Sequence, residues 1–203
     1  MKLFLCSSFD EVIPLYKSFD KDLYKGKRVA FIPTAVNVED YKENVIVAKK
    51  CLKELGMIVY NIDIATADYS LVEDTIKLCD SIYIAGGNTF YLLQELIRTK
   101  TDKLIIDAII AGKLYIGESA GSMIVSNNID YVRAMDDPSL APLLTTFDAL
   151  SLVDFYVVPH YNDEPFKDIA HKMYDDNSSN LNMIAIGNSE AITVVDSKVS
   201  VMK

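Results

Sequence analysis

The residues best suited to catalysis form the sequence Gly117-Glu118-Ser119-Ala120-Gly121, which follows an apolar run and precedes a segment able to start a helix. A strand that turns sharply into a helix through Gly-x-Ser-x-Gly presents its serine at the tip of the turn as a nucleophile. Small flanking residues permit that turn, and the N–H groups of the following helix can stabilise an oxyanion. The simpler alternative is a tight crossover in which the glycines serve packing and Ser119 caps the helix.

A second pair of glycines, Gly86 and Gly87, follows the apolar run 83–85 and precedes Asn88, a residue type suited to capping a helix. Free backbone N–H groups in such a loop can hold an anion or an oxyanion. The chain contains neither Gly-x-Gly-x-x-Gly nor a Gly-Lys-Ser/Thr loop. A nucleotide site is therefore the less favoured interpretation of these glycines.

A serine needs a base within hydrogen-bond reach to become nucleophilic, and imidazole is the usual one. Of the two histidines, His160 directly follows the apolar run 155–159, whereas His171 lies in a polar helical segment and is expected at the surface. A third group must hold the imidazole tautomer, and the chain order of α/β-hydrolases favours an acid between the serine and the histidine. The candidate acids are Asp130, Asp136, Asp137, Asp148 and Glu190.

These groups must be positioned by the elements around them, and the chain alternates short apolar runs with longer amphipathic stretches. That alternation is typical of parallel β-α-β units. The predicted strands are Lys2–Ser7, Arg28–Pro33, Ile58–Ile64, Ser81–Ala85, Lys113–Gly117, Asp154–Pro159, Met183–Ile186 and Ile192–Val195. The predicted helices are Val38–Leu55, Thr89–Arg98, Thr101–Ala111 and Pro165–Tyr174, with Thr101 as an N-cap and with Gly56 and Gly112 at C-terminal ends.

The predicted fold is thus a single α/β domain over residues 1–203, a three-layer sandwich with a mostly parallel central sheet of the doubly wound, flavodoxin-like kind. Ligand chemistry in such a sheet is expected at the carboxyl ends of the strands, where both glycine loops and His160 fall. The long irregular stretch 127–146 is expected to be functional or to contain further structure.

The composition limits the partners that this protein can have. Its 203 residues include 20 Lys and Arg and 29 Asp and Glu, a formal net charge of −9, so binding to nucleic acid or an anionic membrane is not expected. Three widely spaced cysteines and two histidines build neither a disulfide framework nor a zinc cluster, and we expect no metal or cofactor. No apolar run is long enough for a signal peptide or a membrane span, which favours a cytoplasmic protein.

Taken together, these motifs resemble the aspartyl dipeptidase, or peptidase E, family of serine peptidases, which is related to cyanophycinase. The resemblance is carried by Ala-Gly-Gly-Asn-Thr-Phe at 85–90, Gly-Glu-Ser-Ala-Gly at 117–121, Phe-Asp-Ala-Leu at 147–150 and Pro-His-Tyr at 159–161. The opening residues and the run 31–35 are also similar to this family, so the resemblance covers nearly the whole chain in order. It implies a glutamine-amidotransferase-like fold.

The resemblance also implies a catalytic set. Ser119 would be the nucleophile and His160 the general base, and the N–H groups of Gly87 and Ala120 would form the oxyanion hole. An Asp-x-Pro-like site at 136–138 makes Asp136 the implied acid of the triad.

Two alternatives to that acid stay open, namely Asp137 and Glu190. The position that carries the acid in glutamine amidotransferases, two residues after the histidine, is Asn162 here and cannot act as a carboxylate. We expect Gly86, Asn88 and Glu190 to contact the substrate.

The implied activity is hydrolysis of short peptides through an acyl-enzyme by a monomer or homodimer, with a preference for dipeptides bearing an N-terminal aspartate. Alternatives are a cyanophycinase-like or esterase activity on the same residues, or a non-catalytic protein that binds an anion or a nucleotide. An aspartate side chain needs local cations, for which Lys167, Arg133 and Arg98 are the candidates. Glu118, at the second position of the Gly-x-Ser-x-Gly turn, is expected to face solvent.

Overall fold

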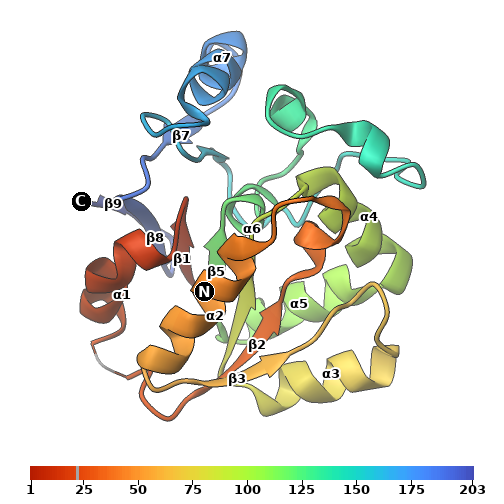
Figure 1. The fold of residues 1–203 in the computed structure, drawn as a ribbon, viewed down its shortest axis with the longest axis vertical. Helices are drawn as coiled ribbons and strands as arrows, with labels where there is room; N and C mark the ends of the chain where they lie inside the picture. Colours follow the sequence, from red (N-terminus) through yellow and green to blue (C-terminus); the bar gives the residue numbers. More distant parts are fainter. Residues whose placement is uncertain (22) are drawn as a thin grey trace.

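A seven-stranded sheet forms the centre of the protein in a computed structural model that describes residues 1–21 and 23–203. The strand order is β3-β2-β4-β5-β1-β8-β9, in which the strands from β3 to β1 run parallel and β8 is antiparallel to both of its neighbours (Figure 1). The strands are β1 Lys2–Cys6, β2 Arg28–Ile32, β3 Ile58–Asn61, β4 Ser81–Ile84, β5 Leu114–Glu118, β8 Ala191–Val195 and β9 Lys198–Met202.

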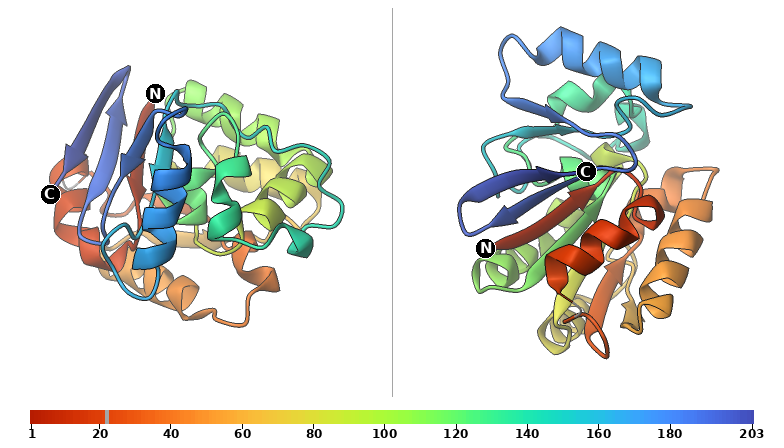
Figure 2. Two further views of the ribbon diagram at one scale, coloured as in Figure 1. Left: turned by 90° about the horizontal axis from the view of Figure 1, so that it is seen from above. Right: turned by 90° about the vertical axis from the view of Figure 1, so that its left-hand side faces the viewer.

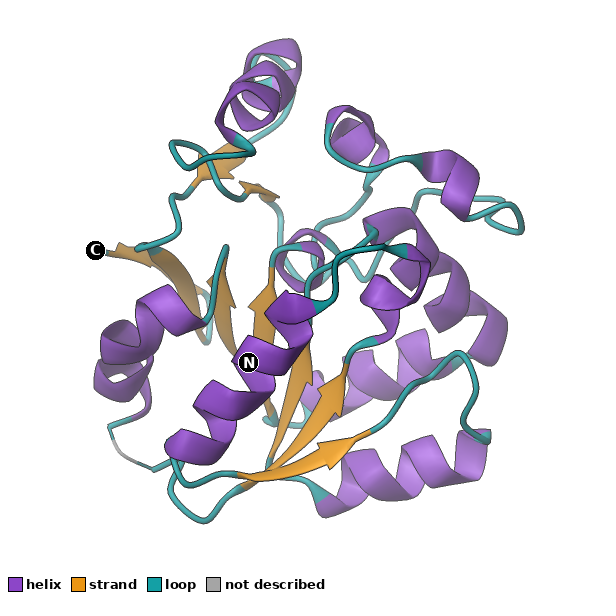
Figure 3. Ribbon diagram, viewed as in Figure 1, coloured by secondary structure: helices purple, strands orange, loops and turns teal. Residues whose placement is uncertain are grey.

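Helices cover both faces of this sheet, as Figure 3 shows. The α-helices are α1 Ile13–Asp20, α2 Glu43–Glu54, α3 Tyr69–Leu78, α4 Thr89–Thr99, α5 Thr101–Ile110, α6 Ala120–Met123 and α7 Lys167–Asn177. Short 3-10 helices are η1 Asp10–Val12, η2 Thr34–Val38, η3 Asp130–Ala134 and η4 Pro138–Leu140.

Successive residues of the central strands point to opposite faces of the sheet, which explains why these strands are apolar throughout. On β1, Leu3 and Leu5 pack in one cluster with residues of α3, α4 and α5, whereas Phe4 and Cys6 pack in another with residues of α1 and α2. All four side chains are fully buried. Because burying a Leu or Phe side chain contributes about 1.5–3 kcal/mol, both faces of the sheet stabilise the fold.

A smaller parallel sheet lies beyond the edge at which the parallel strands of the main sheet end (Figures 1 and 2). It consists of β6 Tyr156–Val158 and β7 Met183–Ala185, paired so that Val158 lies opposite Ala185. Helix α7 connects the two strands. The predicted strands 154–159 and 183–186 therefore exist, but they form their own sheet rather than part of the large one.

The predicted α/β architecture with a mostly parallel central sheet is confirmed, and the largest boundary error is at the start of α2. The apolar spacing predicts a helix from Val38, yet Val38 ends η2 and Glu39 is extended, with φ −97° and ψ 144°. Gly56 follows the helix end as predicted, with φ +83°. Thr101 is wrong as an N-cap, because Lys100, with φ +61°, occupies that position.

The prediction lacks α1, α3 and β9, and also the 3-10 helices η1 and η2. The irregular stretch 127–146 contains η3 and η4, so the expectation of further structure there is confirmed. Within the described residues, no helix has the length and apolar character needed to cross a membrane.

Candidate active site

Three neighbouring strands, β4, β5 and β1, bring the candidate residues to one edge of the sheet. Gly117 of β5 lies opposite both Leu5 of β1 and Ile84 of β4. Ser119 therefore follows the central strand of the three, and the Gly86-Gly87 loop follows the strand beside it. The two glycine loops that the sequence singled out are adjacent because β4 and β5 are adjacent.

Ser119 occupies a strained turn between β5 and α6. Its backbone has φ +49° and ψ −106°, a region that non-glycine residues rarely adopt, and its N–H donates to Cys6 O at 2.9 Å. The Ser119 side chain makes no capping hydrogen bond to α6. The alternative in which Ser119 serves only as a helix cap is therefore wrong.

The glycines around the turn are required for space. A Cβ atom on Gly121 would lie 2.1 Å from Ile84 O, and one on Gly117 would lie 2.4 Å from Gly121 O. Neither position can accept a side chain unless the backbone moves, so this Gly-x-Ser-x-Gly sequence is a close-packed elbow.

The His160 imidazole meets this serine from the smaller sheet. His160 Nε2 lies 3.1 Å from Ser119 Oγ, within hydrogen-bond reach. His160 follows β6 with φ +58°, and its backbone N–H donates to Ser7 Oγ at 3.0 Å. Since Ser7 directly follows β1, this bond ties the histidine to the main sheet.

The group at the other ring nitrogen is an amide. Asn188 Oδ1 lies 2.7 Å from His160 Nδ1. The Asn188 N–H donates to Asp163 Oδ2 at 2.7 Å and its Nδ2 donates to Glu11 Oε1 at 3.3 Å. Because Glu11 accepts from the amide nitrogen, the amide oxygen faces the imidazole, accepts from Nδ1–H and leaves Nε2 free to accept the serine proton.

The acids proposed for that position lie elsewhere. Asp136 Oδ2 accepts from the Thr89 N–H at 2.7 Å, and among the described hydrogen bonds it makes none to His160. Asp137 is exposed and accepts from the Ser139 N–H at 2.8 Å. Glu190 accepts from the Gly187 N–H and pairs with Lys203. We therefore correct the expectation that Asp136, Asp137 or Glu190 orients the imidazole in this structure.

Asn188 is absent from the sequence candidates because all of them are carboxylates. A signal was present, since Asn188 follows the predicted strand 183–186 just as His160 follows 154–159. The parallel pairing of β6 with β7 makes those two strand ends neighbours.

Burial lowers the pKa of His160 below its usual value. The contact with Asn188 and the charge of Asp163 act in the opposite direction but are smaller effects. The imidazole is thus neutral, and able to accept a proton, from mildly acidic pH upward.

Two backbone N–H groups are free to face a developing oxyanion. Ala120 begins α6, so its N–H has no acceptor within the helix. The Gly87 N–H donates to no other described residue. Gly87 has φ +141°, and a Cβ there would lie 2.3 Å from Ala35 C, so only glycine fits this loop.

Glu118 does not face solvent, and that expectation is wrong. Its side chain is buried, with the Phe9 N–H donating to Oε1 at 3.0 Å and the Tyr83 hydroxyl donating to Oε2 at 2.9 Å. Burial raises the pKa of Glu118 to about 7, and a contact with the Gly86 N–H partly offsets that rise. Glu118 therefore helps to hold the Gly86-Gly87 loop in place through its contact with the Gly86 N–H.

A cavity of about 380 Å³ opens in front of Ser119 and His160. The Gly86-Gly87 loop and Asn88 form part of its wall. Asn88 Oδ1 caps α4 by accepting from the Tyr91 N–H, and Asn88 Nδ2 donates to Asp137 O, so both ends of this amide are engaged within the protein. The predicted cap is confirmed, whereas Glu190, expected to contact substrate, does not line this cavity.

No arginine or lysine belongs to the described lining of the cavity. Arg98 pairs with Glu95 and donates to Ala65 O, and Arg133 pairs with Asp130. Lys167 begins α7 outside the lining. Within the described residues, no three His, Cys, Asp or Glu side chains gather as a metal site would require.

Comparison with known proteins adds an independent finding. The model of peptidase family S51 matches residues 3–202. Uncharacterized peptidase Lin0382 of Listeria innocua is 51% identical over 197 residues, which cover 97% of this chain and 94% of that protein. Peptidase E of Pasteurella multocida is 32% identical over 73% of this chain and 60% of its own length. The crystal structure of a candidate peptidase E protein from Listeria monocytogenes superposes with a TM-score of 0.94 at 46% identity, covering 100% of this chain and 98% of that one.

Proposed function

The chain belongs to peptidase family S51, a family of serine peptidases, and from that premise we propose that it hydrolyses short peptides with Ser119 as nucleophile and His160 as general base. The observation that carries this proposal is the 3.1 Å contact between His160 Nε2 and the Oγ of a serine held in a strained elbow. An isolated serine hydroxyl is a weak nucleophile, and a neutral imidazole at this distance can take its proton during attack.

In the first step, Ser119 Oγ attacks the scissile carbonyl carbon and His160 Nε2 accepts the hydroxyl proton. Asn188 Oδ1 holds Nδ1–H through this step, so it acts as a positioning residue. An amide can select the tautomer as a carboxylate does, but it brings no charge to stabilise the imidazolium. Asp163, which raises the pKa of His160 by its charge, supplies part of that stabilisation.

The N–H groups of Gly87 and Ala120 are the proposed donors to the oxyanion of the tetrahedral intermediate. Collapse of the intermediate breaks the peptide bond, and His160 delivers its proton to the leaving amine. A water molecule, deprotonated by His160, then attacks the acyl-enzyme and releases Ser119 with its proton restored.

The size of the cavity supports a small substrate. A volume of about 380 Å³ lies at the lower end of the range for small-molecule sites, about 300–1,000 Å³. A preference for N-terminal aspartate, which the resemblance implies, has no cationic partner among the described residues of the lining. The same lining gives no support to a non-catalytic site for an anion.

Reaction with a fluorophosphonate, followed by mass spectrometry of the intact protein, tests the proposal. Wild-type protein should gain one adduct, and Ser119→Ala and His160→Ala should gain none. Ser197→Ala, which removes an exposed hydroxyl from the turn between β8 and β9, is the matched control and should react like the wild type.

Hydrolysis of a panel of dipeptides should fall at least ~10³-fold in Ser119→Ala while its unfolding transition stays unchanged. Near-normal turnover by this variant would refute the assignment of the nucleophile.

A further inference from the structure

We infer that the cavity selects peptides whose acyl-side residue carries a basic side chain, and that it disfavours aspartate at that position. This inference rests on the proposed function, because it takes Ser119 as the residue that receives the acyl group. It extends that function by assigning Glu39 and Asp136 as specificity-determining residues.

The charges of the cavity lining are all negative. Four of its described residues are acidic, namely Glu39, Glu118, Asp136 and Asp137, and none is a lysine or arginine. Glu118 is buried beneath the glycine loop, and the other three come from the segments that follow η2 and η3. A cationic side chain in the cavity would meet several carboxylates, whereas an aspartate side chain would meet only repulsion.

Two of these acids, Glu39 and Asp136, lack a compensating charge. Neither Glu39 nor Asp136 forms an ion pair with another described residue, and both are half-buried. Burial raises the pKa of Asp136 to about 6, and the charge of Glu39 adds to that rise. Both carboxylates line the same cavity, so a cationic side chain bound there would supply the charge that the protein itself does not provide.

The amide of Asn44, at the start of α2, also belongs to this cavity. Its Oδ1 is buried and has no hydrogen-bond partner among the described residues. Asn44 lines the cavity beside the nucleophile, since a Cβ built on Gly86 would lie 3.2 Å from both Asn44 Nδ2 and Ser119 Cβ. A buried acceptor without a donor is costly, so Asn44 is a polar residue of the cavity wall whose hydrogen-bonding capacity the described protein groups leave partly unused.

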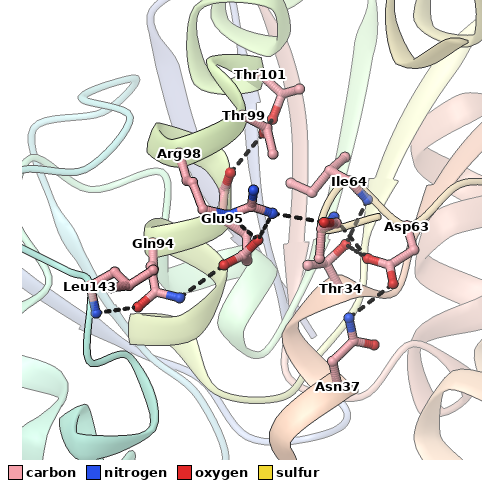
Figure 4. A network of polar contacts seen from close by, with 11 residues as sticks. Thr34, Asn37, Asp63, Ile64, Gln94, Glu95, Arg98, Thr99, Thr101 and Leu143 are labelled. Atoms are coloured by element: carbon pink, nitrogen blue, oxygen red, sulfur yellow. Dashed lines mark hydrogen bonds and ion pairs between the residues drawn. The ribbon is translucent and has the colours of Figure 1, made fainter. Parts of the chain in front are cut away.

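The segments that carry Glu39 and Asp136 form two walls of the cavity, and both are linked to a partly buried polar network centred on α4 (Figure 4). On one side, Asp63 accepts from Thr34 and Asn37 of η2, and Arg98 donates to Ala65 O just beyond Asp63. On the other side, Gln94 Oε1 accepts from the Leu143 N–H at 2.7 Å, which fastens the segment after η4. Because both walls are tied to one helix, the carboxylates are positioned before a substrate arrives.

Calorimetric titration of the Ser119→Ala protein measures this selection without turnover. The ligands are lysine amide, norleucine amide, aspartic acid α-amide and Nα-acetyl-lysine amide. Lysine amide should bind about tenfold more tightly than norleucine amide, as expected for two partly exposed ion pairs, and aspartic acid α-amide should bind most weakly. Nα-acetyl-lysine amide should keep most of the advantage, because the side chain carries it.

Substitution of the wall tests the residues directly. Asp136→Asn and Glu39→Gln should each lower the lysine-to-norleucine affinity ratio about threefold to fivefold. Asp154→Asn is the matched control, because it removes an exposed carboxylate that lines a different surface pocket, together with Met1. This variant should leave the lysine-to-norleucine affinity ratio unchanged. The same order should appear in kcat/KM of the wild type for Lys-Ala, norleucine-Ala and Asp-Ala dipeptides.

The outcomes separate this inference from the proposed function. Fluorophosphonate labelling of Ser119 together with equal affinity for lysine and norleucine amides, or with a preference for the aspartate ligand, would overturn the inference alone. Loss of all binding on Nα-acetylation would overturn it too, since the α-ammonium rather than the side chain would then be recognised. A lysine preference that depends on Glu39 and Asp136, without any labelling, would uphold the charge selection and overturn the peptidase assignment.

Discussion

Replacing Glu118 with glutamine should stabilise the protein at alkaline pH, because the buried carboxylate is costly when ionised. The folded protein raises the pKa of this carboxyl from 4.5 to about 7. The folded state thus binds the proton more tightly than the unfolded state. The contribution of Glu118 to stability is fully present below pH 4.5 and is lost as the pH rises to 7 and beyond.

The size of the effect follows from those two pKa values. At about 1.36 kcal/mol per pKa unit, ionisation of Glu118 costs the folded state about 1 kcal/mol at pH 5 and about 3 kcal/mol at pH 8. The glutamine side chain has no such titration. The free energy of unfolding of Glu118→Gln relative to wild type should therefore rise by about 2–3 kcal/mol between pH 5 and pH 8. Any constant loss from weaker hydrogen bonds to Phe9 and Tyr83 cancels in this difference.

Urea denaturation followed by far-ultraviolet circular dichroism at pH 5 and pH 8 measures the difference. Glu190→Gln is the control of opposite sign, because hydrogen bonding to Gly187 and the contact with Lys203 lower the pKa of Glu190. That variant should lose stability relative to wild type as the pH rises from 5 to 8, or show no gain. A stability gap between Glu118→Gln and wild type that stays the same at both pH values would refute the reasoning about a buried charge.

Other predictions concern the imidazole and the elbow. In wild type, the rate of fluorophosphonate labelling should reach half its maximum below pH 6.5, because burial lowers the pKa of His160. Asn188→Asp should move that midpoint upward by about one pH unit by placing a carboxylate at Nδ1, whereas Asn188→Ala should lower the plateau rate about 10–100-fold and leave the protein folded. A midpoint that is unchanged in Asn188→Asp would show that the amide does not contact the ring in solution. Gly121→Ala should destabilise the protein by more than about 3 kcal/mol in the same denaturation assay, since its Cβ would lie 2.1 Å from Ile84 O, and Gly112→Ala, with open space around its Cβ position, should cost less.

The architecture could be predicted because burial on both faces leaves a clear trace in a sequence. Apolar runs such as 28–33 and 81–85 are continuous, as strands covered on two faces must be, and the helices between them keep an apolar stripe. The errors fall where local pattern and tertiary contact disagree. The periodicity of α2 continues back to Val38, but η2 packs against the Gly87 loop and the chain is extended at Glu39.

The sequence by itself determined the α/β fold, the elbow at Ser119 and the candidacy of His160, because each depends on residue type and close spacing along the chain. Only the tertiary structure decided which group faces His160 Nδ1, where Glu118 lies and which charges line the cavity. Those features depend on segments as distant as Glu11 and Asn188, which meet through strand pairing and loop packing. The sequence pointed to a carboxylate at Asp136 as the partner of the histidine, whereas the pairing of β6 with β7 brings the amide of Asn188 to it.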